Sequence, residues 1–395
     1  MINYFKSYSI IWIVVLCLYG LSWSDLFQPL PFMLILFLII MIISSMLIGF
    51  YFDKKLNICK YLVISEKTNL KNKKPYAYYF LFAYFILTYL HAGMIPVIRV
   101  LRGTSYHLLE YEGIPYITVI MTAIAMYESF RLTYRYFFCK DKRALFYNII
   151  IMVYFLSLVQ RQNVLVCLAI FLNGLYLSKF RGKIKWNYKK VIFLIIAILL
   201  LLYGFGVFGN MRYSSMWAWN NSSMILKLGK ANSKMPSFIP GEYFWSYIYT
   251  ASPLSNLNVN IQTMNPNGNI GQFIYEFIPQ FLANKIGLSR ASVYLPVSAL
   301  TVCTSYARVH NTLGYFGMYI MLMVEYLICF FVTFLTIKYN KENVIPQLFG
   351  VTYVLLLSIF TNPISYSISG VLIIILFVNS FKYRIRHKKG KRGMV

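Results

Sequence analysis

The stretch that decides the fold is residues 30–52, LPFMLILFLIIMIISSMLIGFYF, which carries no charged side chain. At about 1.5 Å per residue, a helix of this length crosses the hydrocarbon layer of a bilayer, which is about 30 Å thick. The whole chain is 59% hydrophobic and only 12% charged, unlike an ordinary soluble domain. Uninterrupted apolar runs also exclude a barrel, whose strands alternate. We therefore predict an all-α polytopic membrane protein of about ten transmembrane helices: 8–23, 30–52, 76–96, 114–138, 144–160, 164–178, 191–208, 311–337, 344–361 and 364–381.

The net charge of +27 resides mainly in the short connectors between these segments. With about ten spans both termini lie on one side, and that side holds 28 of the 38 Lys and Arg residues. The positive-inside rule makes it the cytoplasmic side of a bacterial inner membrane. The basic tail then contacts anionic headgroups of membrane lipids, and no nucleic acid is expected as a partner.

The predicted spans divide the chain into four parts. Residues 1–208 form the first seven spans, 209–310 a large loop on the outer face, 311–381 the last three spans, and 382–395 a basic cytoplasmic tail. A loop this long is uncommon without a function. From residue 210 onward it holds seven basic residues against two glutamates and no aspartate, so it would attract an anionic ligand at the membrane surface. We call residues 209–310 the outward loop.

Several kinds of chemistry lack their usual residues. Six cysteines show no CxxC spacing, so neither disulfides nor a zinc site is expected. Three aspartates without a DxD pair argue against a metal-dependent nucleotide-sugar transferase. The sequence also lacks GxxxxGK[ST], GxSxG and HExxH. We therefore expect neither a cofactor nor a metal.

Arginines on the outward side are the strongest candidates for chemistry. Arg161 lies in the tight connector between the fifth and sixth spans, Arg212 follows the seventh, and Arg290 and Arg308 lie in the outward loop. A guanidinium stays charged in a low dielectric and matches phosphate oxygens with two donors. Snorkelling to headgroups or a structural ion pair is the alternative for each. His310, just before the eighth span, is either structural or a base for an acceptor hydroxyl.

Two further parts of the outward loop suit a glycolipid. The run Tyr243–Tyr249 is dense in aromatic rings, which either line the membrane interface or stack on sugars. Residues 272–285 predict one amphipathic helix kinked at Pro279, with Glu276 on its polar face, either packed on the rim of the bundle or guiding a lipid tail. The candidate substrate-binding residues are Arg290, Glu242, Tyr243, Trp245 and Tyr249.

The architecture and two short motifs resemble the Wzy-type O-antigen polymerases, which polymerise oligosaccharide repeat units. The run 208–212, FGNMR, looks like the family's glycine-asparagine-x-arginine at the exit of a span. His310-Asn311 followed by Gly314-Tyr315-Phe316-Gly317 is similar to the start of the next helix in such polymerases, and His-Asn also occurs in the related ligases. The RX10G pattern of some members does not follow Arg161, Arg212, Arg290 or Arg308.

The resemblance implies a metal-independent glycosyltransferase of lipopolysaccharide or capsular polysaccharide biosynthesis. Its substrates would be two undecaprenyl-pyrophosphate-linked oligosaccharides at the outer face of the plasma membrane, and a chain-length regulator would be a further partner. Catalysis would fall to Arg161, Arg212, Arg308 and His310. Two alternatives stay open: a flippase or transporter for lipid-linked oligosaccharides, and a membrane acyltransferase that modifies surface glycans.

Overall fold

The computed structural model describes residues 3–55, 76–102, 111–180, 188–213 and 221–392. In these ranges the regular secondary structure is helical, apart from one isolated β-bridge between Ser24 and Ala231. The predicted α class is therefore confirmed. The elements are α1 Tyr4–Gly20, α2 Phe32–Lys55, α4 Tyr76–Ala92, α5 Pro96–Leu101, α6 Ile117–Cys139, α7 Lys142–Ser157, α8 Arg161–Phe180, α9 Tyr188–Tyr213, α10 Ser223–Leu228, α11 Glu242–Thr263, α12 Ile270–Tyr275, α13 Gln280–Lys285, α14 Tyr306–Tyr339, the 3-10 helix η4 Lys341–Asn343, α15 Val344–Leu357 and α16 Ser367–Arg392.

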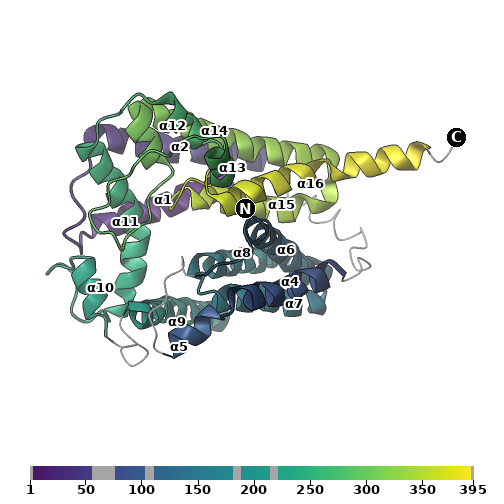
Figure 1. The fold of residues 1–395 in the computed structure, drawn as a ribbon, viewed down its shortest axis with the longest axis horizontal. Helices are drawn as coiled ribbons and strands as arrows, with labels where there is room; N and C mark the ends of the chain where they lie inside the picture. The colour runs from purple at the N-terminus through teal and green to yellow at the C-terminus, as the bar shows by residue number, and fades with distance from the viewer. Residues whose placement is uncertain (1–2, 56–75, 103–110, 181–187, 214–220, 393–395) are drawn as a thin grey trace.

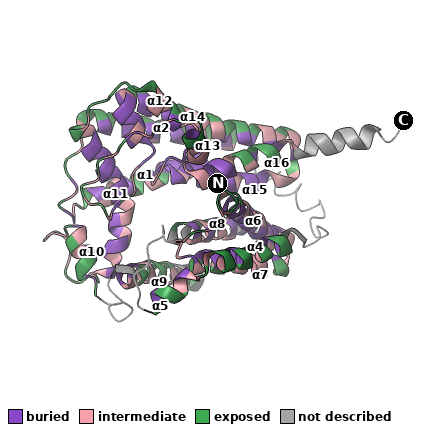
Figure 2. Cartoon of the chain, in the orientation of Figure 1, coloured by how far each residue is buried: buried purple, intermediate pink, exposed green. Residues whose placement is uncertain are grey.

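The helices form two groups that meet at α6. Figure 1 shows α1, α2, α14, α15 and α16 on one side and α4 to α9 on the other. Helix α6 packs on α7 and α8 in its own group and on α15 and α16 across the division. The core between the helices is built of large apolar side chains, and Figure 2 shows it as the buried faces that the helices turn to one another.

Helices α2 and α14 contain, within the described residues, the two segments long and apolar enough to cross a membrane: Phe32–Lys54 and Tyr306–Tyr339. Only 33% and 39% of their most apolar windows are buried, whereas the core helix of a soluble protein would be mostly covered. Apolar surface left open on such long helices indicates association with a membrane. Each of the other eight predicted segments also corresponds to a helix, five of them with shorter apolar stretches of 10–17 residues.

The outward loop contains four helices of its own within the described residues, α10 to α13, and packs against the bundle. Its longest element, α11, contacts α1, α9 and α14, and most of its side chains are buried. The predicted helix over residues 272–285 is instead two short helices, α12 and α13, separated at Pro279. Proline lacks an N–H and disfavours helical geometry in the residue before it, so the helix ends rather than kinks.

Helix α14 is sharply bent near its start. Leu313 and Gly314 have non-helical backbone angles, and Gly314 has φ +63° and ψ −151°, a region that only glycine enters readily. A Cβ on Gly317 would lie 2.5 Å from the carbonyl oxygen of Val309, so this second glycine permits the two halves to approach. The bend separates the segment carrying Arg308 and His310 from the long apolar part of the helix.

Candidate functional site

Two arginines of the outward loop converge on one buried carboxylate. The Nε of Arg290 donates to Oε1 of Glu276 at 3.1 Å, and the Nε of Arg308 lies 3.8 Å from the same oxygen. The Glu276 side chain is fully buried, whereas those of Arg290 and Arg308 are 27% and 28% exposed. We call Arg290 and Arg308 the arginine pair. The sequence places Glu276 on the polar face of a helix, and in the structure its carboxylate is the buried centre of this cluster.

The connection between α15 and α16 fixes Glu276 from the other side. Asn362 Nδ2 donates to Oε2 and to the backbone carbonyl of Glu276, at 3.0 and 2.8 Å. Ser365 Oγ donates to Oε2 at 2.9 Å and accepts from Nη2 of Arg290 at 3.0 Å. A carboxylate that accepts this many hydrogen bonds is held in one orientation. Arg290 is therefore bound at two places, and Arg308 at one.

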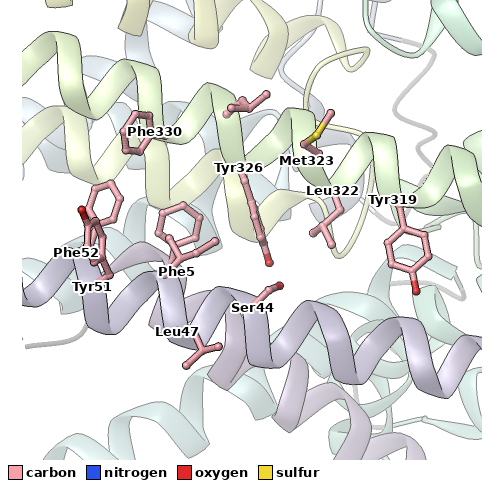
Figure 3. Close-up of a pocket in the computed structure, with 12 residues that line it drawn as sticks. Phe5, Ser44, Leu47, Tyr51, Phe52, Tyr319, Leu322, Met323, Tyr326 and Phe330 are labelled. Atoms are coloured by element: carbon pink, nitrogen blue, oxygen red, sulfur yellow. The ribbon is translucent and has the colours of Figure 1, made fainter.

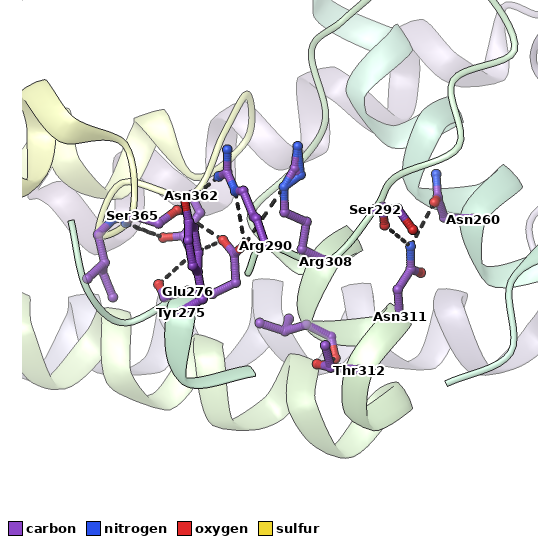
Figure 4. Close-up of polar contacts among 12 residues, drawn as sticks. Asn260, Tyr275, Glu276, Arg290, Ser292, Arg308, Asn311, Thr312, Asn362 and Ser365 are labelled. Carbon is purple, nitrogen blue, oxygen red and sulfur yellow. Dashed lines mark hydrogen bonds and ion pairs between the residues drawn. The ribbon is translucent and has the colours of Figure 1, made fainter. Parts of the chain in front are cut away.

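The charges in this cluster do not cancel. Two guanidinium groups share one carboxylate, which leaves a surplus of one positive charge at a partly exposed place. In Figure 4 the two guanidinium groups lie side by side and point the same way, away from Glu276. Such an arrangement fits an anion with several oxygens, since each guanidinium offers further N–H groups in a planar fork. Arg290 also lies over the ring of Tyr275, at 5.7 Å.

A second polar cluster holds the segment that carries Arg290. Asn311 Nδ2 donates to Oδ1 of Asn260 and to the backbone oxygen of Ser292, both at 2.9 Å (Figure 4). Asn260 in turn accepts from the backbone N–H of Tyr294 at 2.9 Å. These bonds tie residues 292–294 to α11 and α14. The asparagine of the His-Asn motif therefore positions the loop.

The bend of α14 supplies further anchors. The carbonyl oxygens of Asn311 and Thr312 accept hydrogen bonds from the backbone N–H groups of Asn267 and Gly268, at 3.0 and 2.9 Å. Carbonyls at a helix break have no partner in the next turn and need one elsewhere. The segment before α12 satisfies them and is thereby fastened to α14.

His310 lies near the arginine pair in sequence but is turned away from Arg308. Residues two apart on a helix do not face each other. The His310 side chain is 4% exposed, its ring packs edge-on against Tyr315, and its Nδ1 lies 3.5 Å from Oδ1 of Asn311. In this structure its contacts are those of a packed ring next to the bend.

The aromatic run Tyr243–Tyr249 packs helices against one another. Trp245 is 1% exposed, and its Nε1 donates to Oδ1 of Asn210 at 2.7 Å. Gly209 lies against this indole, since a Cβ there would come within 2.5 Å of it. The Gly-Asn of the FGNMR motif is thus one of the contacts between α9 and α11. Glu242 is buried at the start of α11, while Tyr243 and Tyr249 are half-buried and pack against rings of α9.

For two of the predicted arginines, the structure describes the backbone position and not the side chain. Arg161 is the first residue of α8, and Arg212 lies in the last turn of α9. Their side chains lie outside the described part of the chain, so a site of four arginines stays a prediction. What the structure brings together is Arg290 and Arg308.

Sequence reasoning missed Glu276, Asn362 and Ser365 as members of the site. The polar run 361–366, TNPISY, between two apolar segments was the available signal, because polar residues at a helix connection are candidates for ligands. Within the described residues no group of His, Cys, Asp and Glu is arranged to hold a metal ion, and the described cysteines are free. Comparisons with protein families, curated proteins and solved structures find no match.

Proposed function

We propose that this protein polymerises undecaprenyl-pyrophosphate-linked oligosaccharide repeat units by glycosyl transfer at the outer face of the plasma membrane. The observation that carries the proposal is the arginine pair on one buried glutamate, which leaves a partly exposed positive site where α14 begins. A lipid pyrophosphate is an anion at the membrane surface, and a partly exposed cationic site at that surface suits its binding. The resemblance of the FGNMR and His-Asn motifs to Wzy-type polymerases supports the same class.

The proposed topology follows from the charge distribution. All ten apolar segments cross the membrane, both termini are cytoplasmic, and residues 209–310 face outward. The arginine pair then lies at the outer surface, which lipid-linked repeat units reach after translocation. An anionic leaving group in a region of low dielectric is stabilised strongly by a charge fixed in advance.

The reaction needs one bond exchange. The bond between carbon one of the donor sugar and the pyrophosphate oxygen breaks, and the electron pair leaves with the lipid pyrophosphate. The hydroxyl oxygen of the acceptor repeat unit bonds to that carbon, and its proton passes to a base. We assign the leaving pyrophosphate to Arg308 and Arg290, because both present guanidinium N–H groups away from Glu276 (Figure 4).

The two arginines differ in how firmly they are held. Arg290 binds both Glu276 and Ser365, whereas Arg308 makes the longer, single contact. Arg308→Ala should therefore leave membrane abundance normal and remove long glycan chains, with a loss of about 100-fold or more in polymerisation rate. Arg308→Lys keeps the charge without the fork, and its chains should be short as well.

The experiment is complementation of a deletion strain, read as the length distribution of surface glycan. Lys234→Ala is the matched control, since it removes an exposed cation of the same loop and should leave the distribution unchanged. Single repeat units on the lipid carrier in the deletion strain are the expected result. Loss of all surface repeat with accumulation at the cytoplasmic face would indicate a flippase. Full-length chains lacking an acyl group would indicate an acyltransferase.

A further inference from the structure

An apolar groove runs between α2 and α14. It has a volume of about 630 Å³, within the range of ligand pockets, and Phe5 of α1 contributes to its lining. Figure 3 shows side chains of α2 and α14 facing each other across it. The apolar lining includes Leu47, Tyr319, Met323 and Leu327, and Ser44 is its one aliphatic hydroxyl. This groove plays no part in the proposed reaction.

The length of the groove matches one leaflet of a bilayer. Its α14 wall runs from Tyr319 to Phe330, about 16 Å along a helix. Half of a hydrocarbon layer is about 15 Å. The two walls run parallel, because Phe37 packs on Tyr319 at one end and Phe52 on Phe330 at the other. A single acyl chain fits this length, whereas a polyprenyl chain of many isoprene units exceeds it.

Both walls continue to a lysine at the same end. Lys54 lies about two turns beyond Leu47 on the same face of α2, and Lys338 about three turns beyond Leu327 on the same face of α14. Both lysines are exposed, and the Nζ of Lys338 lies over the rings of Phe334 and Tyr339. Lysines at the ends of membrane helices lie at the depth of the lipid headgroups.

We propose that this groove binds one anionic phospholipid of the inner leaflet, with an acyl chain between α2 and α14 and its phosphate at Lys54 and Lys338. The apolar walls select the chain, and the two cations select the charge of the headgroup. This inference rests on the proposed topology, in which the lysine ends of α2 and α14 are cytoplasmic, and is independent of the proposed polymerase activity.

The experiment uses the full chain in vesicles of phosphatidylcholine with a small fraction of phosphatidylglycerol that carries a photoreactive group in its acyl chain. Peptide mapping should find adducts concentrated on residues 44–52 and 319–330. Competition with unlabelled phosphatidylglycerol gives an apparent Kd. Lys54→Gln and Lys338→Gln should each weaken binding by about five-fold. A photoreactive phosphatidylcholine should label the groove weakly.

The steric test has a matched control on the same helix. Leu47→Trp fills the groove and should abolish its adducts, whereas Leu36→Trp, on the same exposed face of α2 outside the groove, should leave them intact. Adducts spread evenly over exposed helix faces would overturn the proposal. So would equal labelling by phosphatidylcholine, or a groove that takes a polyprenyl phosphate in place of the phospholipid.

Discussion

Glu276 is the residue on which the charge of the candidate site depends. It is fully buried, receives both arginines at Oε1 and receives Asn362 and Ser365 at Oε2. A buried carboxylate without cationic partners would be costly, and two arginines without it would repel each other. The sequence shows the arginines and predicts that they bind phosphate. It does not show which acid they share, because Glu276 lies distant from both along the chain.

Glu276→Gln should destabilise the fold around α12. The amide keeps the shape but replaces charge-assisted hydrogen bonds with weaker ones, at a cost of about 1–3 kcal/mol, a range that allows for the solvent screening of the part-exposed arginines. Equilibrium unfolding in mixed detergent micelles measures the change. Glu342→Gln, in η4, should stay within about 0.5 kcal/mol. Equal stability of the two variants would show that the carboxylate does not hold the arginine pair.

Cys303 reports the environment of Arg308. Burial raises the pKa of its thiol to about 12, and the charge of Arg308 opposes this shift. A raised pKa keeps the thiol protonated, so maleimide labelling should be slow at neutral pH and increase about ten-fold per pH unit up to at least pH 10. Arg308→Ala should slow it further at each pH. The measurement is the rate of maleimide labelling in a protein whose other cysteines are replaced. A rate that stops rising near pH 9 would contradict the raised pKa of the Cys303 thiol.

At the scale of elements, the length of the apolar runs predicted the membrane-length helices. Single residues such as proline and asparagine predicted the helix breaks and the shorter helices less well. All ten expected segments are helical, because long apolar runs depend little on tertiary contacts. Helix α11 was missed. It buries Asn256, Asn258 and Asn260, whose amides bind backbone oxygens of neighbouring segments, and buried asparagines look like loop residues in a sequence. The separation of α12 from α13 followed from Pro279, which was read as a kink.

Gly314→Ala tests the bend of α14. Its backbone angles cost a residue with a Cβ about 1–3 kcal/mol, and a Cβ would also lie 3.3 Å from Pro266. We expect Gly314→Ala to lower the free energy of unfolding and to hold the segment that carries Arg308 less firmly in place. Gly204→Ala in α9 is the contrast, since a Cβ there meets nothing within 4 Å and alanine favours a helix by about 0.5–1 kcal/mol. In equilibrium unfolding, the free energy of unfolding should fall for Gly314→Ala and rise for Gly204→Ala. An unchanged value for Gly314→Ala would show that the backbone at this position is not strained.

For the whole molecule, the decisive question is how many helices cross the membrane. Helices α2 and α14 qualify by length and composition, and the proposed topology adds eight more crossings. Charge counting assigns sides to the connectors, but helix lengths alone do not, because α7 and α15 are short for a bilayer.

Single cysteines at Lys140 and Lys234 distinguish these arrangements. With ten crossings, Lys140 is cytoplasmic and Lys234 faces outward. With α2 and α14 as the two crossings, both positions lie on the same side. We expect a membrane-impermeant maleimide to label intact cells at position 234 and to reach position 140 after permeabilisation. Labelling of both positions from outside would contradict the ten-span topology.

Metal-independent polymerisation at the arginine pair is measured most directly with the purified protein in liposomes that contain lipid-pyrophosphate-linked repeat units and a chelator. The products are then separated by length. We expect chains of many repeat units that persist in the chelator and are lost with Arg308→Ala but retained with Lys234→Ala. Unpolymerised repeat units with the wild-type protein, or long chains made by Arg308→Ala, would contradict it.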